Sequence, residues 1–171
     1  MTDVSPTLFP AELQKRAEVL LQAARTGSGT IATAESCTGG LIAALFTEIP
    51  GSSDVFERGY VTYSNAAKAE CLGVSAQLIE KHGAVSREVA HAMADGAAAR
   101  ARTDIAIAVT GIAGPGGGTP QKPIGLVHIA IHRKGHLTRH AENRFGDIGR
   151  AAIRLATVKE VLTILEKMLL S

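Results

Sequence analysis

The sequence contains no tryptophan, and aromatic residues of all kinds make up only 4% of its 171 positions. Proteins that hold single-stranded nucleic acid stack the bases on aromatic rings, so this scarcity argues against that class. The net charge is only +2, and the 18 lysines and arginines are spread along the chain. Because a nucleic-acid binder needs clustered positive charge, we expect no nucleic-acid partner.

Cysteines and long apolar runs are also scarce. Cys37 and Cys71 are too few for a disulfide framework in a chain of this length. The N-terminal stretch MTDVSPTLFP has no basic segment followed by an apolar one, and no stretch approaches the ~20 apolar residues of a membrane span. We therefore expect a cytoplasmic protein with reduced cysteines and no membrane contact.

Helical and extended patterns alternate along most of the chain. The predicted helices cover residues 11–26, 41–48, 65–72, 76–82, 87–102 and 148–170. The predicted strands cover residues 30–35, 57–64 and 104–114, followed by a hairpin that turns at Lys134 and Gly135. This order predicts an α/β three-layer α/β/α sandwich with a mostly parallel mixed sheet, in which the hairpin supplies one antiparallel strand.

The domain organisation that we predict is simple. Residues 1–11 are expected to form a mobile leader, and residues 12–171 a single domain. Asn65, Ser75 and Ser86 are predicted to cap the helices that begin beside them. The helix predicted over residues 87–102 is rich in alanine and is a candidate to face a partner subunit, so we expect a homo-oligomer.

The corner TAESCTGG, residues 33–40, follows a predicted buried strand and precedes a helix. Ligands gather at this end of the strands in parallel α/β sheets, which makes Ser36 a candidate nucleophile. The alternative is that Ser36 or Thr38 caps the helix while the glycines turn the chain. Cys37 is a rival nucleophile, but no histidine lies near it in the sequence, and an apolar helix entrance raises the pKa of a thiol.

The block YSNAAK places Tyr63 at the end of the second strand and Lys68 in a short helix. Burial disfavours an ammonium, so a buried Lys68 can accept a proton from Ser36. The spacing matches neither the Tyr-x-x-x-Lys nor the Ser-x-x-Lys pattern of known enzymes. The alternative is a solvated surface lysine.

The segment TGIAGPGGGTPQKP follows the third predicted strand directly. Backbone N–H groups in such a loop form an anion-binding nest or an oxyanion hole. The segment is not a phosphate-binding Walker loop, because Gly117 and Gly118 stand where Lys-Ser/Thr is required. The alternative is a flexible surface loop.

Histidines and arginines near the C-terminus form two further groups of candidate residues. His128, His132, His136 and His140 recur every fourth residue, but they cross the hairpin turn and include no carboxylate, so we expect no metal. In the closing helix, Arg150 and Arg154 lie one turn apart and either bind a phosphate together or are solvated.

Four blocks of the sequence, in this order, resemble the CinA C-terminal domain family, the bacterial nicotinamide mononucleotide amidohydrolases. They are AESCTGG, GYVTYSNAAKAECLGV, GAVSREVAHAMADGA and VTGIAGPGGGTPQKPIGLVHIA, and the resemblance covers about residues 12 to 168. It implies hydrolysis of the carboxamide of nicotinamide mononucleotide to nicotinate mononucleotide and ammonia, a salvage step in NAD metabolism that needs no cofactor. Larger CinA proteins carry an additional N-terminal domain, and this chain resembles the stand-alone amidase form.

The resemblance implies roles for three residues in catalysis. Ser36 is the implied nucleophile, Lys68 the base that activates it, and Tyr63 a helper that orients or relays the proton. Together with the corner, the glycine loop and the arginine pair, it leads us to expect these substrate-binding residues: Thr110, Gly39, Gly40, Gly111, Gly114, Gly116, Arg150 and Arg154.

One departure from the family pattern bears on Arg150. Where the family has Gly-Asp-Arg, this chain reads GDIGR, with two residues between the aspartate and the arginine. The departure motivates an alternative function, a pyridine-nucleotide-binding or regulatory module without catalysis.

Overall fold

A five-stranded sheet with the strand order β2-β1-β3-β4-β5 forms the middle layer of the protein. The structure is a computed structural model that describes residues 7–27 and 29–171. The strands are β1 (Ile31–Glu35), β2 (Phe56–Val61), β3 (Ile105–Gly111), β4 (Leu126–Arg133) and β5 (Arg139–Arg144). Strands β1, β2 and β3 pair in parallel, whereas β4 pairs antiparallel with both β3 and β5. Only β4 therefore runs against the others, which confirms the mostly parallel sheet that the sequence predicts.

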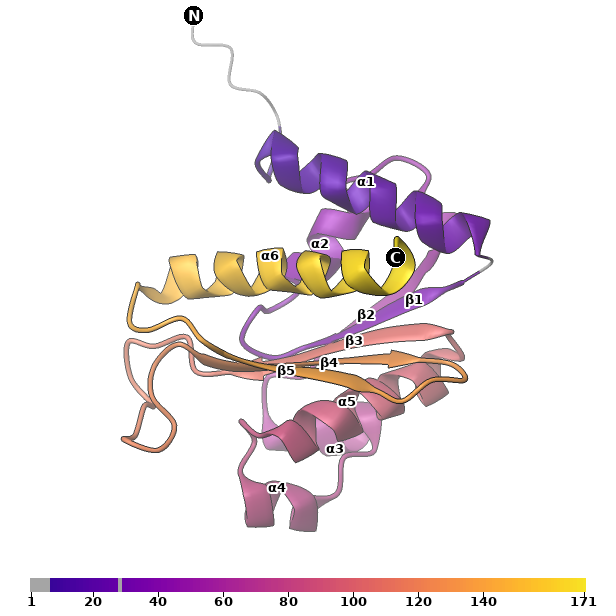
Figure 1. Ribbon diagram of the computed structural model, residues 1–171. Coiled ribbons are helices and arrows are strands. Elements are labelled where there is room, and N and C mark those ends of the chain that lie inside the picture. The colour runs from indigo at the N-terminus through magenta and orange to yellow at the C-terminus, as the bar shows by residue number, and fades with distance from the viewer. Residues whose placement is uncertain (1–6, 28) are drawn as a thin grey trace, which may run out of the picture.

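Helices cover both faces of the sheet, as Figure 1 shows. They are α1 (Ala11–Thr26), α2 (Leu41–Thr47), α3 (Asn65–Leu72), α4 (Ala76–His82), α5 (Arg87–Ala101) and α6 (Arg150–Leu169). One face carries α1, α2 and α6, and the other carries α3, α4 and α5 (Figure 1). Across the described ranges, no helix combines the length and the apolar character that a membrane span requires.

Alternation of large and small residues in β3 explains how the two faces differ. Ile105, Ile107 and Val109 point into the core beneath α1, α2 and α6. Ala106 and Ala108, between them, point to the other face and contact the cluster formed with α5. Small side chains on the sheet let α5 lie close to it, since interiors are filled to crystal-like density.

The alanines of α5 are buried within the chain itself. Ala90, Ala94 and Ala97 are fully buried in the cluster between α5 and the sheet. A Cβ added at Gly96 would lie 2.0 Å from the carbonyl oxygen of Leu72, so α5 also lies against α3. These small residues thus serve packing within the chain.

Serine side chains cap the three helices α3, α4 and α5, which lie on the same face of the sheet. Ser75 accepts a hydrogen bond from the N–H of Leu78, and Ser86 accepts one from Val89, as predicted. For α3, the cap is Ser64, which accepts from Ala67, and the prediction of Asn65 was wrong by one residue. The extended backbone of Ser64 places its hydroxyl at the first unpaired amides of the helix.

The N-terminal end of the chain is only partly described. Residues 1–6 of the predicted leader lie outside the described residues. Phe9 is buried against the core, and α1 begins at Ala11.

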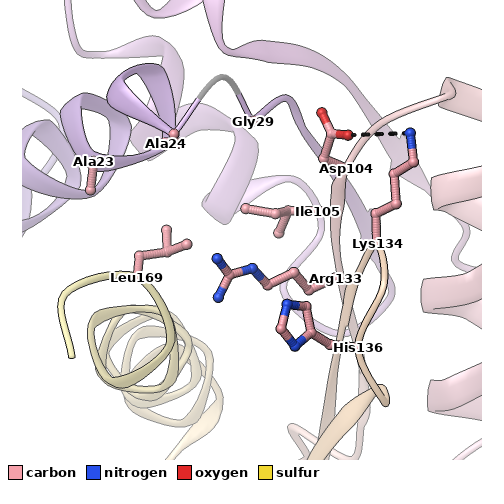
Figure 2. A pocket seen from close by; sticks show the side chains of 10 residues that line it. Ala23, Ala24, Gly29, Asp104, Ile105, Arg133, Lys134, His136 and Leu169 are labelled. Carbon is pink, nitrogen blue, oxygen red and sulfur yellow. Dashed lines mark ion pairs between the residues drawn. The ribbon is translucent and has the colours of Figure 1, made fainter.

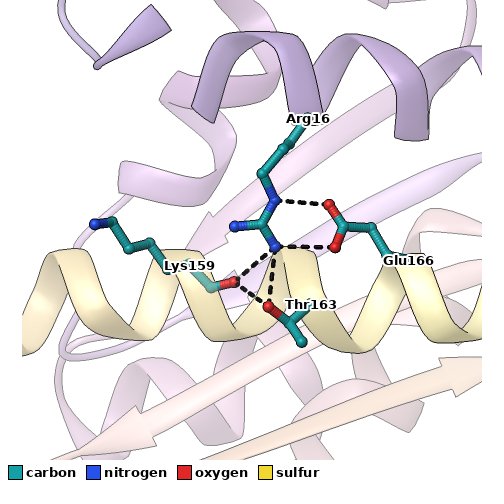
Figure 3. Close-up of polar contacts among 4 residues, drawn as sticks. All are labelled: Arg16, Lys159, Thr163 and Glu166. Carbon is teal, nitrogen blue, oxygen red and sulfur yellow. Dashed lines mark hydrogen bonds and ion pairs between the residues drawn. The ribbon is translucent and has the colours of Figure 1, made fainter. Parts of the chain in front are cut away.

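An arginine–glutamate pair joins α1 to α6, as Figure 3 shows. The guanidinium of Arg16 lies with Nε 2.6 Å and Nη2 3.0 Å from the two carboxylate oxygens of Glu166. Nη2 also donates to the hydroxyl of Thr163 at 2.9 Å. The fork geometry links the first helix to the last, which are far apart in the sequence.

Candidate functional site

Ser36 and Lys68 meet at the carboxyl end of β1. Ser36 follows the last residue of β1 directly, and Lys68 projects from α3. The Nζ of Lys68 lies 3.1 Å from the Oγ of Ser36 and 2.9 Å from the carbonyl oxygen of Thr62. The exposed fraction is 9% for Ser36 and 1% for Lys68. The pair is therefore a hydroxyl and an amine in hydrogen-bond contact, almost out of reach of bulk water.

Burial lowers the pKa of Lys68, because removal from water disfavours the charged ammonium, although the nearby Cys37 opposes this change. The described chain places no carboxylate in hydrogen-bond contact with Nζ to restore the charge. A lysine in this setting gives up its proton more readily than a free one. The alternative of a solvated surface Lys68 does not hold.

Glu35 fixes the corner that carries Ser36. Its carboxylate is fully buried and accepts hydrogen bonds from the backbone N–H groups of Gly40 at 3.1 Å, Ile42 at 3.1 Å and Ala43 at 2.9 Å. It thereby caps α2 from a position five residues before the cap residue Gly40, and a negative charge at a helix N-terminus is favourable. Neither Ser36 nor Thr38 caps this helix, so the capping alternative was wrong.

Cys37 is the neighbour of Ser36, and its thiol is a poor nucleophile here. Burial raises the pKa of Cys37 to about 11, so the thiol stays protonated at neutral pH. A Cβ added at Gly111 would lie 3.1 Å from its Sγ, so the thiol fills space against β3.

Tyr63 and Arg150 close one side of this region. Tyr63 lies between β2 and α3 with 61% of its surface exposed, and Arg150 opens α6. Nη2 of Arg150 donates to the Oη of Tyr63 at 2.9 Å, and Nη1 donates to the carbonyl oxygen of Gly114 at 2.9 Å. The two residues intervening in GDIGR therefore leave the arginine at the glycine loop.

Arg154 has a different set of partners from Arg150. Its Nε donates to the carbonyl of Cys37 at 3.1 Å, and its Nη2 donates to the carbonyl of Thr38 at 3.0 Å. The guanidinium thus stabilises the corner by binding two of its carbonyl groups. It also lies close to Gly39, since a Cβ added there would lie 3.2 Å from Nη2 of Arg154. Arg150 and Arg154 face different partners, and they do not form one fork.

Thr110 lies near the end of β3, beside β1, and is almost fully buried. Its hydroxyl donates to the carbonyl of Ala84 at 2.8 Å, in the turn between α4 and α5. Residues 112–125 then form a loop in which Gly116 is exposed and the carbonyl of Gly114 is held by Arg150. Ser36 directly follows β1, and Thr110 lies one residue before the end of β3, so the two residues lie at the carboxyl ends of adjacent parallel strands.

The histidines lie elsewhere and do not share one site. Nδ1 of His128 lies 3.0 Å from Nε2 of His140, while His132 pairs with Asp95 and His136 is exposed. Within residues 7–27 and 29–171, no group of three or more histidine, cysteine, aspartate or glutamate side chains is arranged to hold a metal ion.

A separate cavity of about 320 Å³ lies at the opposite end of β3 (Figure 2). Its lining includes Ile105, Leu169, Arg133 and the ion pair of Asp104 with Lys134 at 4.0 Å. Ile105 begins β3, whereas Thr110 lies at its far end. The cavity is therefore distinct from the Ser36 region.

Sequence reasoning missed two contributors to the site. Glu35 stands next to the candidate nucleophile in a strand predicted to be buried, and a buried carboxylate needs hydrogen-bond partners, which is a signal that could have identified it. The carbonyl of Thr62, which accepts from Lys68, carries no sequence signal because every residue has one.

The fold and these contacts define a class of α/β/α sandwiches with a buried serine–lysine pair at the carboxyl ends of the parallel strands. A family model described as the CinA C-terminal domain matches residues 13–169. The chain belongs to the CinA C-terminal domain family.

The chain is also similar to individual curated proteins that are named as CinA-like. The chain is 50% identical over 156 residues to a CinA-like protein of Parasynechococcus marenigrum (strain WH8102), covering 91% of this chain and 37% of that protein. It is 46% identical over 168 residues to a CinA-like protein of Citrifermentans bemidjiense, covering 98% of this chain and 40% of that one. The chain thus spans well under half the length of these curated relatives.

Solved structures share the fold. The competence/damage inducible protein CihA from Agrobacterium tumefaciens has a TM-score of 0.90 and 50% identity, covering 93% of this chain and 96% of that one. A CinA superfamily protein from Escherichia coli has a TM-score of 0.88 and 33% identity, with 95% of each chain covered.

Proposed function

We propose that the chain is an amidase that hydrolyses the carboxamide of nicotinamide mononucleotide to nicotinate mononucleotide and ammonia. The observation that carries the proposal is the 3.1 Å contact between the buried Nζ of Lys68 and the Oγ of Ser36. A serine needs a base within hydrogen-bond reach to become a nucleophile, and a desolvated lysine is such a base. Membership of the CinA C-terminal domain family supports the substrate through the resemblance of the motifs.

The first half of the reaction forms an ester on Ser36. Neutral Lys68 takes the proton of the hydroxyl while Oγ attacks the carboxamide carbon, and the carbonyl electron pair moves to oxygen. Lys68 then gives its proton to the amide nitrogen, the C–N bond breaks, and ammonia leaves. The backbone N–H of Thr38 donates to no acceptor in the described chain, so it is free to bind the oxyanion.

The second half releases the product with the same two residues. A water gives its proton to Lys68 and attacks the ester carbon. The Oγ of Ser36 then leaves and recovers a proton from Lys68, which frees the nicotinate carboxylate. The balance is one amide and one water converted to one acid and one ammonia.

The 5′-phosphate of the substrate gives Arg150 a role. Each terminal nitrogen of Arg150 has a second N–H beyond those given to Tyr63 and Gly114. Arg150 also begins α6, whose first amides have no side-chain cap and favour a nearby anion. When the phosphate binds between Arg150 and the start of α6, the carboxamide at the other end of the substrate extends toward Ser36.

The test is ammonia release from nicotinamide mononucleotide by purified protein, with and without a chelator. We expect Ser36→Ala to abolish release while calorimetry still detects substrate binding. Cys37→Ala is the matched control, because it removes the neighbouring thiol and should retain turnover. Normal turnover by Ser36→Ala contradicts the mechanism, and a folded but inactive Cys37→Ala transfers the role of nucleophile to the thiol.

A second candidate, a nucleotide-binding or regulatory module, is favoured by the altered GDIGR segment. The same two measurements distinguish it from the amidase. Binding of nicotinamide mononucleotide by the wild-type protein without ammonia release supports the module and excludes the enzyme.

A further inference from the structure

The glycine-rich segment 111–121 is held at both ends by the same short turn. Thr110, just before the segment, donates from its hydroxyl to the carbonyl oxygen of Ala84 at 2.8 Å. Lys122, just after it, donates from Nζ to the carbonyl oxygen of His82 at 2.6 Å. His82 is the last residue of α4, and Ala84 lies two residues further on, in the turn that joins α4 to α5.

Gly83, between the two acceptors, is shaped to receive Lys122. A Cβ at Gly83 would lie 2.7 Å from Nζ of Lys122, so a side chain there would displace the ammonium. Gly83 also has a φ of +78°, a left-handed conformation that other residues rarely adopt. The turn thus has both the room and the acceptor that the ammonium requires.

The local setting makes the contact of Lys122 with His82 stronger than a surface contact. Lys122 is half-buried, and its charge faces the carbonyl end of α4, where a cation is favourable. The backbone of Lys122 is fixed as well, since its N–H donates to the hydroxyl of Thr119 and its carbonyl accepts from the N–H of Thr119. A charge-assisted hydrogen bond between two fixed partners holds the loop in one place.

We infer that Lys122 is a positioning residue that holds the glycine loop against the 82–84 turn, and so sets where the loop meets the substrate. The inference rests on the proposed amidase function for its kinetic consequence. Thr110 and Lys122 fix the two ends of the loop, and Arg150 holds Gly114 between them. Loss of the Lys122 contact leaves the Ser36–Lys68 pair intact and frees one end of the loop.

The experiment compares Lys122→Met with Lys81→Met, which removes an exposed lysine from the end of α4. Kinetics with nicotinamide mononucleotide should show KM raised about tenfold in Lys122→Met with kcat within about threefold of wild type, because binding has to order the freed loop. Lys122→Arg, which keeps a charged donor, should recover part of the loss. Gly83→Ala, which displaces the ammonium, should resemble Lys122→Met.

Amide hydrogen exchange measures the contact without relying on catalysis. Peptides covering 82–86 and 112–121 should exchange faster in Lys122→Met than in wild type or Lys81→Met. If the wild-type protein releases no ammonia, the proposed function fails and exchange alone decides this inference. Unchanged exchange in both peptides overturns it, as does an unchanged KM in an active enzyme.

Discussion

Arg150 and Tyr63 are 87 positions apart in the sequence, yet Nη2 of Arg150 lies 2.9 Å from Oη of Tyr63. The contact brings the start of α6 to the segment between β2 and α3, and α3 is the helix that carries Lys68. Since Nη1 of the same arginine holds the carbonyl of Gly114, one guanidinium connects three separate parts of the site.

From this contact we predict selective loss of phosphate recognition in Arg150→Met. KM for nicotinamide mononucleotide should rise roughly tenfold or more, whereas KM for the corresponding nucleoside, which lacks the phosphate, should change little. Tyr63→Phe should shift KM in the same direction by less, as the ring remains. The control is Arg144→Met, because Arg144 pairs with Glu142 at the surface. Equal losses on both substrates would show that Arg150 does not bind the phosphate.

The lowered pKa of Lys68 predicts the pH dependence of the reaction. Only the neutral amine accepts the serine proton, so kcat/KM should rise with pH as Lys68 deprotonates. The apparent pKa of this rise should lie below the ~10.4 of a free lysine, because burial disfavours the ammonium. Stopped ammonia assays across pH, with ionic strength held constant, measure it.

The substitution Lys68→Arg tests at a single pH whether Lys68 is the base that accepts the serine proton. A guanidinium stays protonated, so it cannot take the serine proton, and kcat should fall by about 10²–10⁴-fold. Lys81→Arg is the control at an exposed position. Retention of most of the activity in Lys68→Arg would exclude Lys68 as the base.

Much of the fold could be predicted because the local signals agreed with one another. The helix predicted over residues 11–26 is α1 with the same bounds, and the strand predicted over residues 104–114 contains β3. The pairing of Ser36 with Lys68 was predicted from the ability of a buried lysine to accept a serine proton, and from the roles that the family resemblance implies.

Other features depend on contacts that the sequence does not carry. The cap of α2 came from Glu35, not from the residue at the cap position, because its buried carboxylate reaches three amides at once. The sequence does not show that the buried alanines of α5 lie against the alanines of the sheet. The sequence suggested that Arg154 binds a phosphate together with Arg150. The direction of its guanidinium toward the carbonyls of Cys37 and Thr38 is set by tertiary packing.

Glu35→Gln should destabilise the protein by about 2 kcal/mol, since charged acceptors contribute more than neutral ones and an amide NH₂ would face backbone donors. Urea unfolding at pH 7 measures the change, with the exposed Glu70→Gln as control. Activity should fall by more than the loss of folded protein explains, because the corner that Glu35 fixes carries Ser36. A stability change within error of Glu70→Gln would show that the carboxylate charge contributes nothing.

The bridge between Arg16 and Glu166 should contribute about 1 kcal/mol to the free energy of unfolding, because it is bidentate and partly shielded. Double-mutant cycles with Arg16→Met and Glu166→Gln isolate the pairwise part, and Lys15→Met serves as an exposed control in the same helix. Additive effects of the two single substitutions would show that the pair does not couple α1 to α6.

Stability in acid should depend on His140. Burial, together with the neighbouring His128 and His91, lowers the pKa of His140 to about 4. A histidine in the unfolded chain has a pKa of about 6.5, so the unfolded state takes up a proton first as the pH falls. The folded state should therefore lose stability between pH 6.5 and pH 4, and His140→Gln should flatten that loss. Urea midpoints measured at half-unit steps, with the exposed His136→Gln as control, test this. An equally steep loss in His140→Gln and wild type would assign the acid sensitivity to other groups.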